Sequence, residues 1–205
     1  MLHDGLWDSN LDLVRACLAH PFVQALGDGT LKSDLFRVFI GQDAFFLRAF
    51  LKAYALALAR SEDAEAIAAF YDLIGGVLDE LKLYRAYAAE LGIDLQRVVA
   101  NPACRAYTDF LLRTAWHTSL GETLAAMTPC MRLYAYLGGE LVSKCSGRHP
   151  YRGWIEAYSS EEFGRLATRL EALLDRIAED TREVQESYRY ALQCELNFFS
   201  GVLSP

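Results

Sequence analysis

Long stretches of helix-forming sequence, separated by short breaks, most constrain how this chain can fold. Ala, Leu, Arg and Glu dominate and favour helices, whereas β-branched residues are scarce. Leu166, Leu170, Leu173, Leu174 and Ile177 recur at helical spacing with charged residues between them, as in an amphipathic helix. The sequence therefore predicts an all-α protein.

Proline, glycine and capping residues predict where the helices begin and end. We expect His20-Pro21 to end the first helix and Gly27-Asp28-Gly29 to form a turn. Asn101-Pro102 reads as an N-cap followed by a first-turn proline, and Ser159 with Glu162 matches a capping box. Helices are predicted over about 9–19, 33–60, 63–91, 101–119, 122–144 and 181–203, with a short one after Pro150 and another after Ser159.

The apolar stripes of these helices are too wide for the narrow seam of a coiled coil, and they favour a helical bundle. No internal repeat and no long Pro-, Gly- or Ser-rich linker divides the 205 residues. We therefore expect a single helical domain over residues 1–205.

Charge and hydropathy exclude several classes of partner. The formal net charge is −7 and the basic residues are scattered, so no concentrated positive patch indicates nucleic acid or an anionic membrane. The most apolar stretch, about 36–58, is interrupted by five charged or amide side chains and is predicted to be a core helix. The start of the chain does not resemble a secretory signal. Five cysteines without a CxxC pair fit reduced thiols in the cytoplasm.

Two carboxylates fall inside apolar helical patterns. Asp43 shares a predicted helix face with Phe39 and Phe46, and Glu195 lies within an apolar run near the end of the chain. A buried carboxylate is costly unless it is paired or hydrogen-bonded. For each, the alternatives are a structural partner (Arg37 or an amide for Asp43) and a functional site.

Cys130 follows Pro129 inside a predicted helix, where proline removes a backbone hydrogen bond. Tyr134 lies four residues later, on the same face as the thiol. A free cysteine is often an inert buried hydrophobe, and a reactive one needs an acid–base or cationic partner nearby. Tyr107 and Tyr158 are either core residues or pocket residues by pattern alone.

No metal or cofactor is expected. The four histidines are far apart in sequence, no Glu-x-x-His pair repeats, and phosphate-loop and zinc motifs are missing. His20 could in principle be an axial haem ligand, but a histidine at a helix end is more often a cap or a surface residue.

At several of these positions the sequence resembles the TenA family, thiaminase II or aminopyrimidine aminohydrolase, in its cysteine-containing branch. The resemblance implies a haem-oxygenase-like fold and hydrolysis of an exocyclic C–N bond on an aminopyrimidine or thiamin, in thiamin salvage. The segments that carry it are His20-Pro21-Phe22-Val23-Gln24, Gly27-Asp28-Gly29-Thr30-Leu31, Gln42-Asp43, Pro129-Cys130 with Leu133-Tyr134, Trp154-Ile155 with Tyr158, and Glu195 ahead of Phe198 and Phe199.

The resemblance also implies roles for individual residues. Cys130 matches the nucleophile, Glu195 the carboxyl group that moves protons to the leaving group and from water, and Asp43 the carboxylate that holds the pyrimidine edge. Phe46 occupies a position where the family often has tyrosine, and this difference bears on substrate preference. The remaining positions expected to line the pocket are Tyr107, Tyr134, Tyr158 and, by a weaker match, Glu80.

Three alternatives stay open from sequence. The substrate could be a formylaminopyrimidine or another substituted aminopyrimidine. The chain could instead be a non-catalytic pyrimidine-binding regulator, or an oxidative enzyme on the same fold. The resemblance further suggests a homo-oligomer, a tetramer or a dimer.

Overall fold

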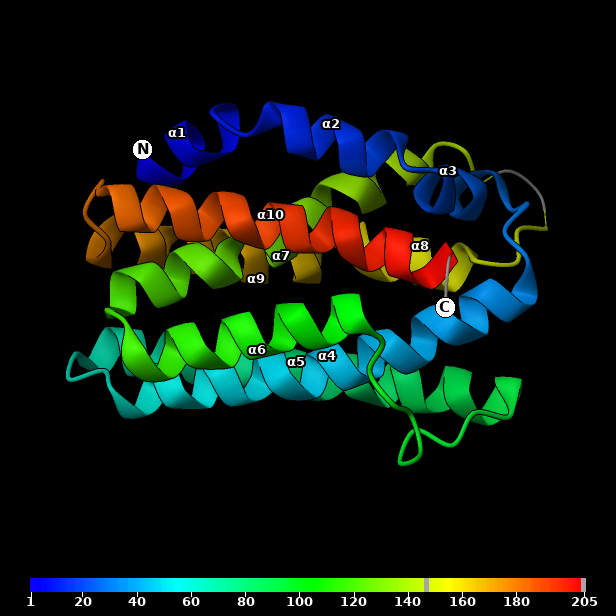
Figure 1. Cartoon of the computed structure of the whole chain (residues 1–205), viewed down its shortest axis with the longest axis horizontal. Helices are drawn as coiled ribbons and strands as arrows, with labels where there is room; N and C mark the ends of the chain where they lie inside the picture. Colours follow the sequence, from blue (N-terminus) through cyan, green and yellow to red (C-terminus); the bar gives the residue numbers. More distant parts are fainter. Residues whose placement is uncertain (146–147, 204–205) are drawn as a thin grey trace.

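The computed structural model describes residues 1–145 and 148–203, and within them the chain forms ten α-helices and no β-strand (Figure 1). The prediction of an all-α fold is confirmed. In chain order the helices are α1 (Leu2–Asp8), α2 (Leu11–Ala19), α3 (Pro21–Asp28), α4 (Ser33–Ala59), α5 (Ala64–Leu91), α6 (Pro102–His117), α7 (Leu120–Val142), α8 (Arg152–Tyr158), α9 (Glu161–Ile177) and α10 (Arg182–Leu203).

The long helices pack as two groups joined through a shared interior. Helix α4 packs on α5 and α6, whereas α7 packs on α9 and α10. The short helices α1 to α3, which form the N-terminal end of the chain, pack against α10 (Figure 1). One contiguous cluster of buried apolar side chains extends through both groups. Every long helix therefore turns one face toward the same interior.

The starts and ends of the long helices agree with the sequence predictions to within about two residues, but the N-terminal region does not. Pro21 begins α3 instead of a loop, because the Nδ1 atom of His20 accepts a hydrogen bond from the Phe22 amide at 3.2 Å and caps the helix. Proline suits that first position, since its missing N–H would have no helical partner. The predicted turn is also shifted, and only Gly29 takes the left-handed conformation that ends α3.

The predicted capping box at Ser159 is wrong by one residue. Ser160 is the N-cap of α9 and accepts a hydrogen bond from the Phe163 amide at 3.1 Å, whereas Ser159 ends α8. A complete capping box is found instead at the start of α7, between Ser119 and Glu122. Both serines offer the same side chain, and only the position of the preceding helix decides which one caps.

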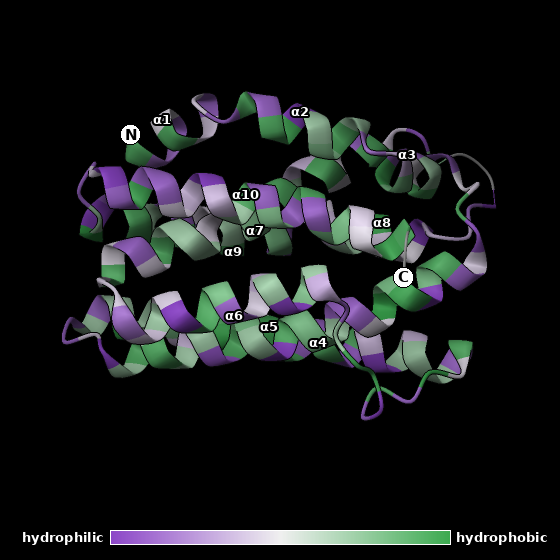
Figure 2. Cartoon of the chain, viewed as in Figure 1, coloured by the Kyte–Doolittle hydropathy of each residue, from purple (hydrophilic) through white to green (hydrophobic). Residues whose placement is uncertain are grey.

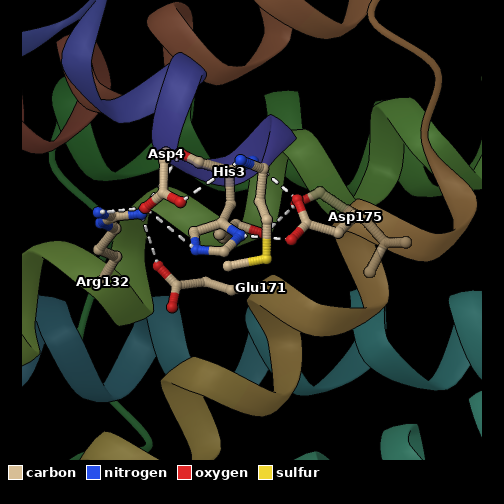
Figure 3. A network of polar contacts seen from close by, with 8 residues as sticks. His3, Asp4, Arg132, Glu171 and Asp175 are labelled. Atoms are coloured by element: carbon tan, nitrogen blue, oxygen red, sulfur yellow. Dashed lines mark hydrogen bonds and ion pairs between the residues drawn. The ribbon is translucent and has the colours of Figure 1, made fainter.

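A network of charged side chains ties α1 to α7 and α9 (Figure 3). His3 Nδ1 lies 2.6 Å from Oδ2 of Asp175, and Asp4 lies next to both His3 and Arg132. Arg132 also pairs with Glu171, with 2.9 Å between Nη1 and Oε1. All of these side chains except Asp4 are largely shielded from water, so the pairs between the shielded groups are screened less than a surface pair. The network fixes the N-terminal helix against the bundle.

The outward helix faces carry hydrophilic residues interspersed with hydrophobic ones, as the hydropathy colouring of Figure 2 shows. Among the described residues, no helix combines the length and the apolar character that crossing a bilayer would require.

Two adjacent glycines of α7 give a matched test of packing. A Cβ on Gly138 would lie 2.6 Å from the backbone of Tyr158 and Ser159, whereas a Cβ on Gly139 would meet nothing within 4 Å. Both substitutions to alanine gain helix propensity. We expect Gly138→Ala to be less stable than Gly139→Ala by about 1–3 kcal/mol, because the backbone of α8 must move away. Denaturant unfolding of the two variants measures the difference, and equal stabilities would contradict the close approach of α7 and α8.

Candidate active site

The side chains predicted to form a site come from six different helices and meet in the interior of the bundle. Asp43 and Phe46 lie on α4, Glu80 on α5, and Tyr107 on α6. Six of the eight line one enclosed cavity, and the other two, Tyr107 and Glu195, are linked to it by direct contacts. The cavity is small, about 10 Å³, and is lined by Asp43, Phe46, Leu47, Phe50, Glu80, Cys130, Met131, Tyr134, Tyr158 and Phe163.

Cys130 is paired with a carboxyl group. Its thiol interacts with the side chain of Glu195, and the hydroxyl of Tyr107 donates to Oε1 of Glu195 at 2.8 Å. Glu195 is only 1% exposed. The neighbouring cation Arg132 is two residues from Cys130, on another face of α7, and is held in the network of Figure 3. The acid–base partner of the thiol is therefore Glu195.

The pKa of the Cys130 thiol is raised well above its usual value, first by burial and then by the negative charges of Glu195, Glu80 and Asp43. The thiol is consequently protonated at rest, and it becomes a nucleophile only when a neighbouring group takes its proton. Glu195, the first of its charged neighbours, is the group that can do so.

A second chain of polar groups runs along the opposite wall. Tyr84 donates a hydrogen bond to Oδ2 of Asp43, and Tyr158 donates to Oε1 of Glu80. The two tyrosine oxygens are 3.0 Å apart, and the indole N–H of Trp154 donates to Tyr84 at 3.2 Å. We refer to Glu80, Tyr158, Tyr84 and Asp43, linked in that order, as the tyrosine chain. The partner of Asp43 is thus a tyrosine hydroxyl and not Arg37 or an amide.

Sequence reasoning missed Tyr84 as a site residue. Tyr84 lies four residues after Glu80 on the buried stripe of α5, so it shares a helix face with the acid. That spacing could have indicated it as a pocket residue. Trp154 was noted in the sequence, but its role in positioning Tyr84 depends on how α8 packs.

All three buried carboxyl groups hold their protons more tightly than usual. Burial, which disfavours the charged form, raises the pKa of Asp43 to about 7 although the hydrogen bond from Tyr84 opposes it. Burial likewise raises the pKa of Glu80 to about 8, with a further contribution from Asp43. Burial raises the pKa of Glu195 to about 8, against the hydrogen bonds of Tyr107 and Cys130. Near neutral pH these acids can both give and accept protons.

The remaining walls of the cavity are apolar and aromatic. Phe46 packs against Tyr107 with 4.7 Å between ring centroids, and Tyr134 packs against Tyr158 at 5.0 Å. Phe46 carries no hydroxyl, so polar contacts on that side come from neighbouring residues. In the described part of the chain, no three His, Cys, Asp or Glu side chains are grouped so that they could hold a metal ion.

An open groove between α5 and α9 borders the cavity. Four residues line both spaces: Glu80, Met131, Tyr158 and Phe163. Asp79 and Glu162 add acidic side chains to the groove, and no Lys or Arg of the described residues lines it. The groove is therefore the side from which a small molecule would reach Cys130, and its charge favours a neutral or cationic one.

Comparison with known proteins identifies the family of this chain. Residues 7–204 match the model of the TENA/THI-4/PQQC family. Over 180 residues the chain is 37% identical to an aminopyrimidine aminohydrolase of Halalkalibacterium halodurans, which covers 85% of this chain and 80% of the relative. It is also 36% identical over 206 residues to the mitochondrial bifunctional TH2 protein of Arabidopsis thaliana, which covers 87% of this chain. The match spans only 33% of that longer plant protein.

Solved structures of related proteins show the same fold. A TenA homologue from Pyrococcus furiosus superposes with a TM-score of 0.92 at 26% identity, over 98% of this chain and all of that one. A domain with a heme oxygenase-like fold from Shewanella denitrificans superposes with a TM-score of 0.78 at 14% identity, over 98% of this chain and 91% of that one. The predicted haem-oxygenase-like fold is confirmed, and the chain belongs to the TENA/THI-4/PQQC family.

Proposed function

We propose that this protein is an aminopyrimidine aminohydrolase of the thiaminase II kind. It would hydrolyse the exocyclic C–N bond of 4-amino-5-aminomethyl-2-methylpyrimidine, or of thiamin, to give hydroxymethylpyrimidine for thiamin salvage. One observation carries the proposal: a buried thiol, Cys130, interacts with a buried carboxyl, Glu195, beside a cavity that also holds Asp43. The aminopyrimidine aminohydrolase from Halalkalibacterium halodurans supports the substrate class.

Asp43 suits recognition of the pyrimidine edge. An aminopyrimidine presents an amino N–H next to a ring nitrogen, and one carboxylate can face both when that nitrogen is protonated. Tyr84 already donates to Oδ2 of Asp43, which fixes the orientation of the carboxylate. Binding the protonated ring also makes the ring more electrophilic. The cavity walls close tightly, so a flat ring would enter as Met131 and Phe163 move toward the groove.

Cys130 and Glu195 suit the chemical step. An amine on a methylene next to an aromatic ring is a poor leaving group in water. When Glu195 takes the thiol proton, the sulfur can add to the ring, and the electrons of the ring can then expel the exocyclic nitrogen. Tyr107 holds Glu195 in place by its 2.8 Å hydrogen bond. The reaction needs no metal or organic cofactor.

The alternatives differ in how well these residues support them. A formylaminopyrimidine substrate would use the same thiol, and the absence of a hydroxyl on Phe46 is the feature that bears on this choice. A non-catalytic binding protein would have no need of a thiol paired with Glu195. An oxidative activity would need a redox group or a co-reactant, and an absorption spectrum of the purified protein would reveal a bound chromophore.

We also infer a cytoplasmic homo-oligomer. The five cysteines are free thiols, which fits a reducing compartment. Large apolar side chains on the outer faces, including Tyr71 and Trp116, are exposed and would suit an interface between copies. Light scattering of the purified protein measures the number of copies.

Replacing the thiol tests the proposal directly. Cys130→Ala should lower kcat for the aminopyrimidine by several orders of magnitude while the protein stays folded, because covalent catalysis is lost. Cys145→Ala, which removes a thiol that does not line the cavity, is the matched control and should keep wild-type turnover. Ammonia release and a melting curve measure both effects, and rapid ammonia release by Cys130→Ala would refute the proposal.

Asp43 gives a second test. Asp43→Asn keeps the size of the side chain and can still accept a hydrogen bond from Tyr84, but it removes the negative charge that faces the pyrimidine. Truncated charge-assisted hydrogen bonds cost about 1.5–3 kcal/mol, so KM should rise by about 10- to 150-fold. Steady-state kinetics measure this, and unchanged kcat and KM would contradict the assigned role.

The proton affinity of Glu195 has a consequence for stability. Its pKa is raised in the folded protein, so between about pH 5 and pH 8 the folded state holds a proton that the unfolded chain has released. Stability from this group is therefore lost as the pH rises. The free energy of unfolding of wild type relative to Glu195→Gln should fall by up to about 1.4 kcal/mol per pH unit across this window. Urea unfolding at several pH values measures it, and a pH-independent difference would contradict the raised pKa.

A further inference from the structure

The hydroxyl oxygen of Tyr84 is the point at which the tyrosine chain meets a further donor. It contacts Oδ2 of Asp43, the hydroxyl of Tyr158 at 3.0 Å and the indole nitrogen of Trp154 at 3.2 Å, and the Tyr84 side chain is fully buried. A phenol offers one hydrogen and two lone pairs, so three contacts use its full capacity. An indole N–H can only donate, so Trp154 occupies one lone pair. The Tyr84 hydrogen is therefore directed either to Asp43 or to Tyr158.

The tyrosine chain needs one proton beyond those of its two hydroxyls. Its contacts are Glu80–Tyr158, Tyr158–Tyr84 and Tyr84–Asp43, and the two tyrosines supply only two hydrogens. When both carboxyl groups are ionised, both hydrogens go to them, and the contact between the tyrosine oxygens has none. One added proton, on Glu80 or on Asp43, gives every contact its hydrogen. The two placements differ in what Asp43 presents to a ligand.

Glu80 is the better place for the added proton. Burial and the negative charge of Asp43 raise the pKa of Glu80 to about 8. Burial raises the pKa of Asp43 only to about 7, because the hydrogen bond from Tyr84 opposes the rise. With the proton on Glu80, each group of the chain donates to the next, and the last bond runs from Tyr84 to Asp43. Asp43 is then ionised, and its oxygens can only accept hydrogen bonds.

An ionised Asp43 distinguishes two kinds of pyrimidine edge. A 4-aminopyrimidine with a protonated ring nitrogen presents two adjacent N–H groups, and both can donate to the carboxylate. A 4-oxopyrimidine presents one N–H beside a carbonyl oxygen, and that oxygen would face a carboxylate oxygen with no hydrogen between them. A protonated Asp43, with one donor and one acceptor, would pair with either edge. Only the ionised form therefore separates the two ligands.

We propose that Tyr84, held by Trp154, is a specificity-determining residue: it keeps Asp43 an acceptor of hydrogen bonds only, so that the site selects 4-amino over 4-oxo pyrimidines. The inference rests on the part of the proposed function in which Asp43 holds the pyrimidine ring. Tyr84 and Trp154 act through Asp43 and are positioning residues, and Glu80 holds the proton of the chain. The roles of Cys130 and Glu195 in the reaction are unchanged.

Binding of two matched ligands tests the inference without turnover. The ligands are 4-amino-5-hydroxymethyl-2-methylpyrimidine, the product of the proposed reaction, and its 4-oxo analogue, and calorimetric titration at pH 7 gives Kd for each. Since a charge-assisted hydrogen bond contributes about 1.5–3 kcal/mol, wild type should prefer the amino compound by about 10- to 150-fold. Tyr84→Phe should reduce this preference by about tenfold, because Asp43 loses the donor that favours its ionised form.

Trp154→Phe removes the indole N–H and keeps an aromatic ring. It should reduce the preference in the same direction as Tyr84→Phe but by a smaller factor. The double variant should show no further loss beyond Tyr84→Phe, because Trp154 acts through the Tyr84 oxygen. A fully additive loss would overturn the role of Trp154. If Tyr84→Phe does not fold, Trp154→Phe decides, and an unchanged preference in that variant overturns the inference.

Tyr87→Phe is the matched control. Tyr87 lies three residues after Tyr84 on α5, its ring packs against that of Tyr84 with 6.4 Å between centroids, and it is not a member of the tyrosine chain. This variant should keep the wild-type preference, and melting curves check that every variant is folded. A wild-type preference retained in Tyr84→Phe, or an equal loss in Tyr87→Phe, would overturn the inference.

The proposed function fails by a different result. A wild-type protein that binds the amino compound selectively but releases no ammonia from the aminomethylpyrimidine would overturn the proposed function and leave the selectivity of Asp43 standing. A wild-type protein that releases ammonia but binds the amino and oxo compounds equally would overturn this inference alone. Binding of neither compound would overturn both.

Discussion

The burial of three carboxyl groups around one thiol is the constraint on which this structure depends. An ionised carboxylate away from water is costly, so each of these acids needs hydrogen-bond donors or a proton. Tyr107 donates a hydrogen bond to Glu195, Tyr84 donates one to Asp43, and Tyr158 donates one to Glu80. Each donor comes from a different helix than the acid that it serves. The polar network can therefore exist only when the helices are packed in this arrangement.

The same burial gives the site its proposed chemistry. Because burial raises the pKa values of the acids toward neutrality, they can exchange protons near physiological pH. The thiol, in contrast, is kept protonated by its acidic neighbours until one of them accepts its proton. A resting thiol of this kind is protected from unwanted reactions, and it becomes reactive when a substrate and a proton acceptor are both in place. The aromatic walls add a flat apolar surface without further charge.

The charged network of α1 shows that two residues close together on α7 can serve separate purposes. Arg132 holds the N-terminal helix through Asp4 and Glu171, whereas Cys130 turns to the interior. An α-helix places residues two positions apart on nearly opposite faces, so one short segment contributes both to stability and to the candidate site. A positive charge next to Cys130 in sequence is thus no indication of a positive charge next to its sulfur.

Local sequence determined the long helices, because apolar spacing, helix propensity and caps act over a few residues. The periodic stretches that became α4, α5, α7 and α10 were predicted with nearly their observed ends, and the eight site residues were named from pattern and family resemblance. The error at Ser159 arose because two neighbouring serines offered equivalent signals, and the error at Pro21 because a proline that ends one helix can also begin the next. Only the tertiary structure decided that Tyr84 pairs with Asp43 and that Glu80 separates the cavity from the groove. The physical reason is that a hydrogen bond between side chains 41 residues apart depends on how two helices are rotated and aligned against each other, which no local pattern encodes.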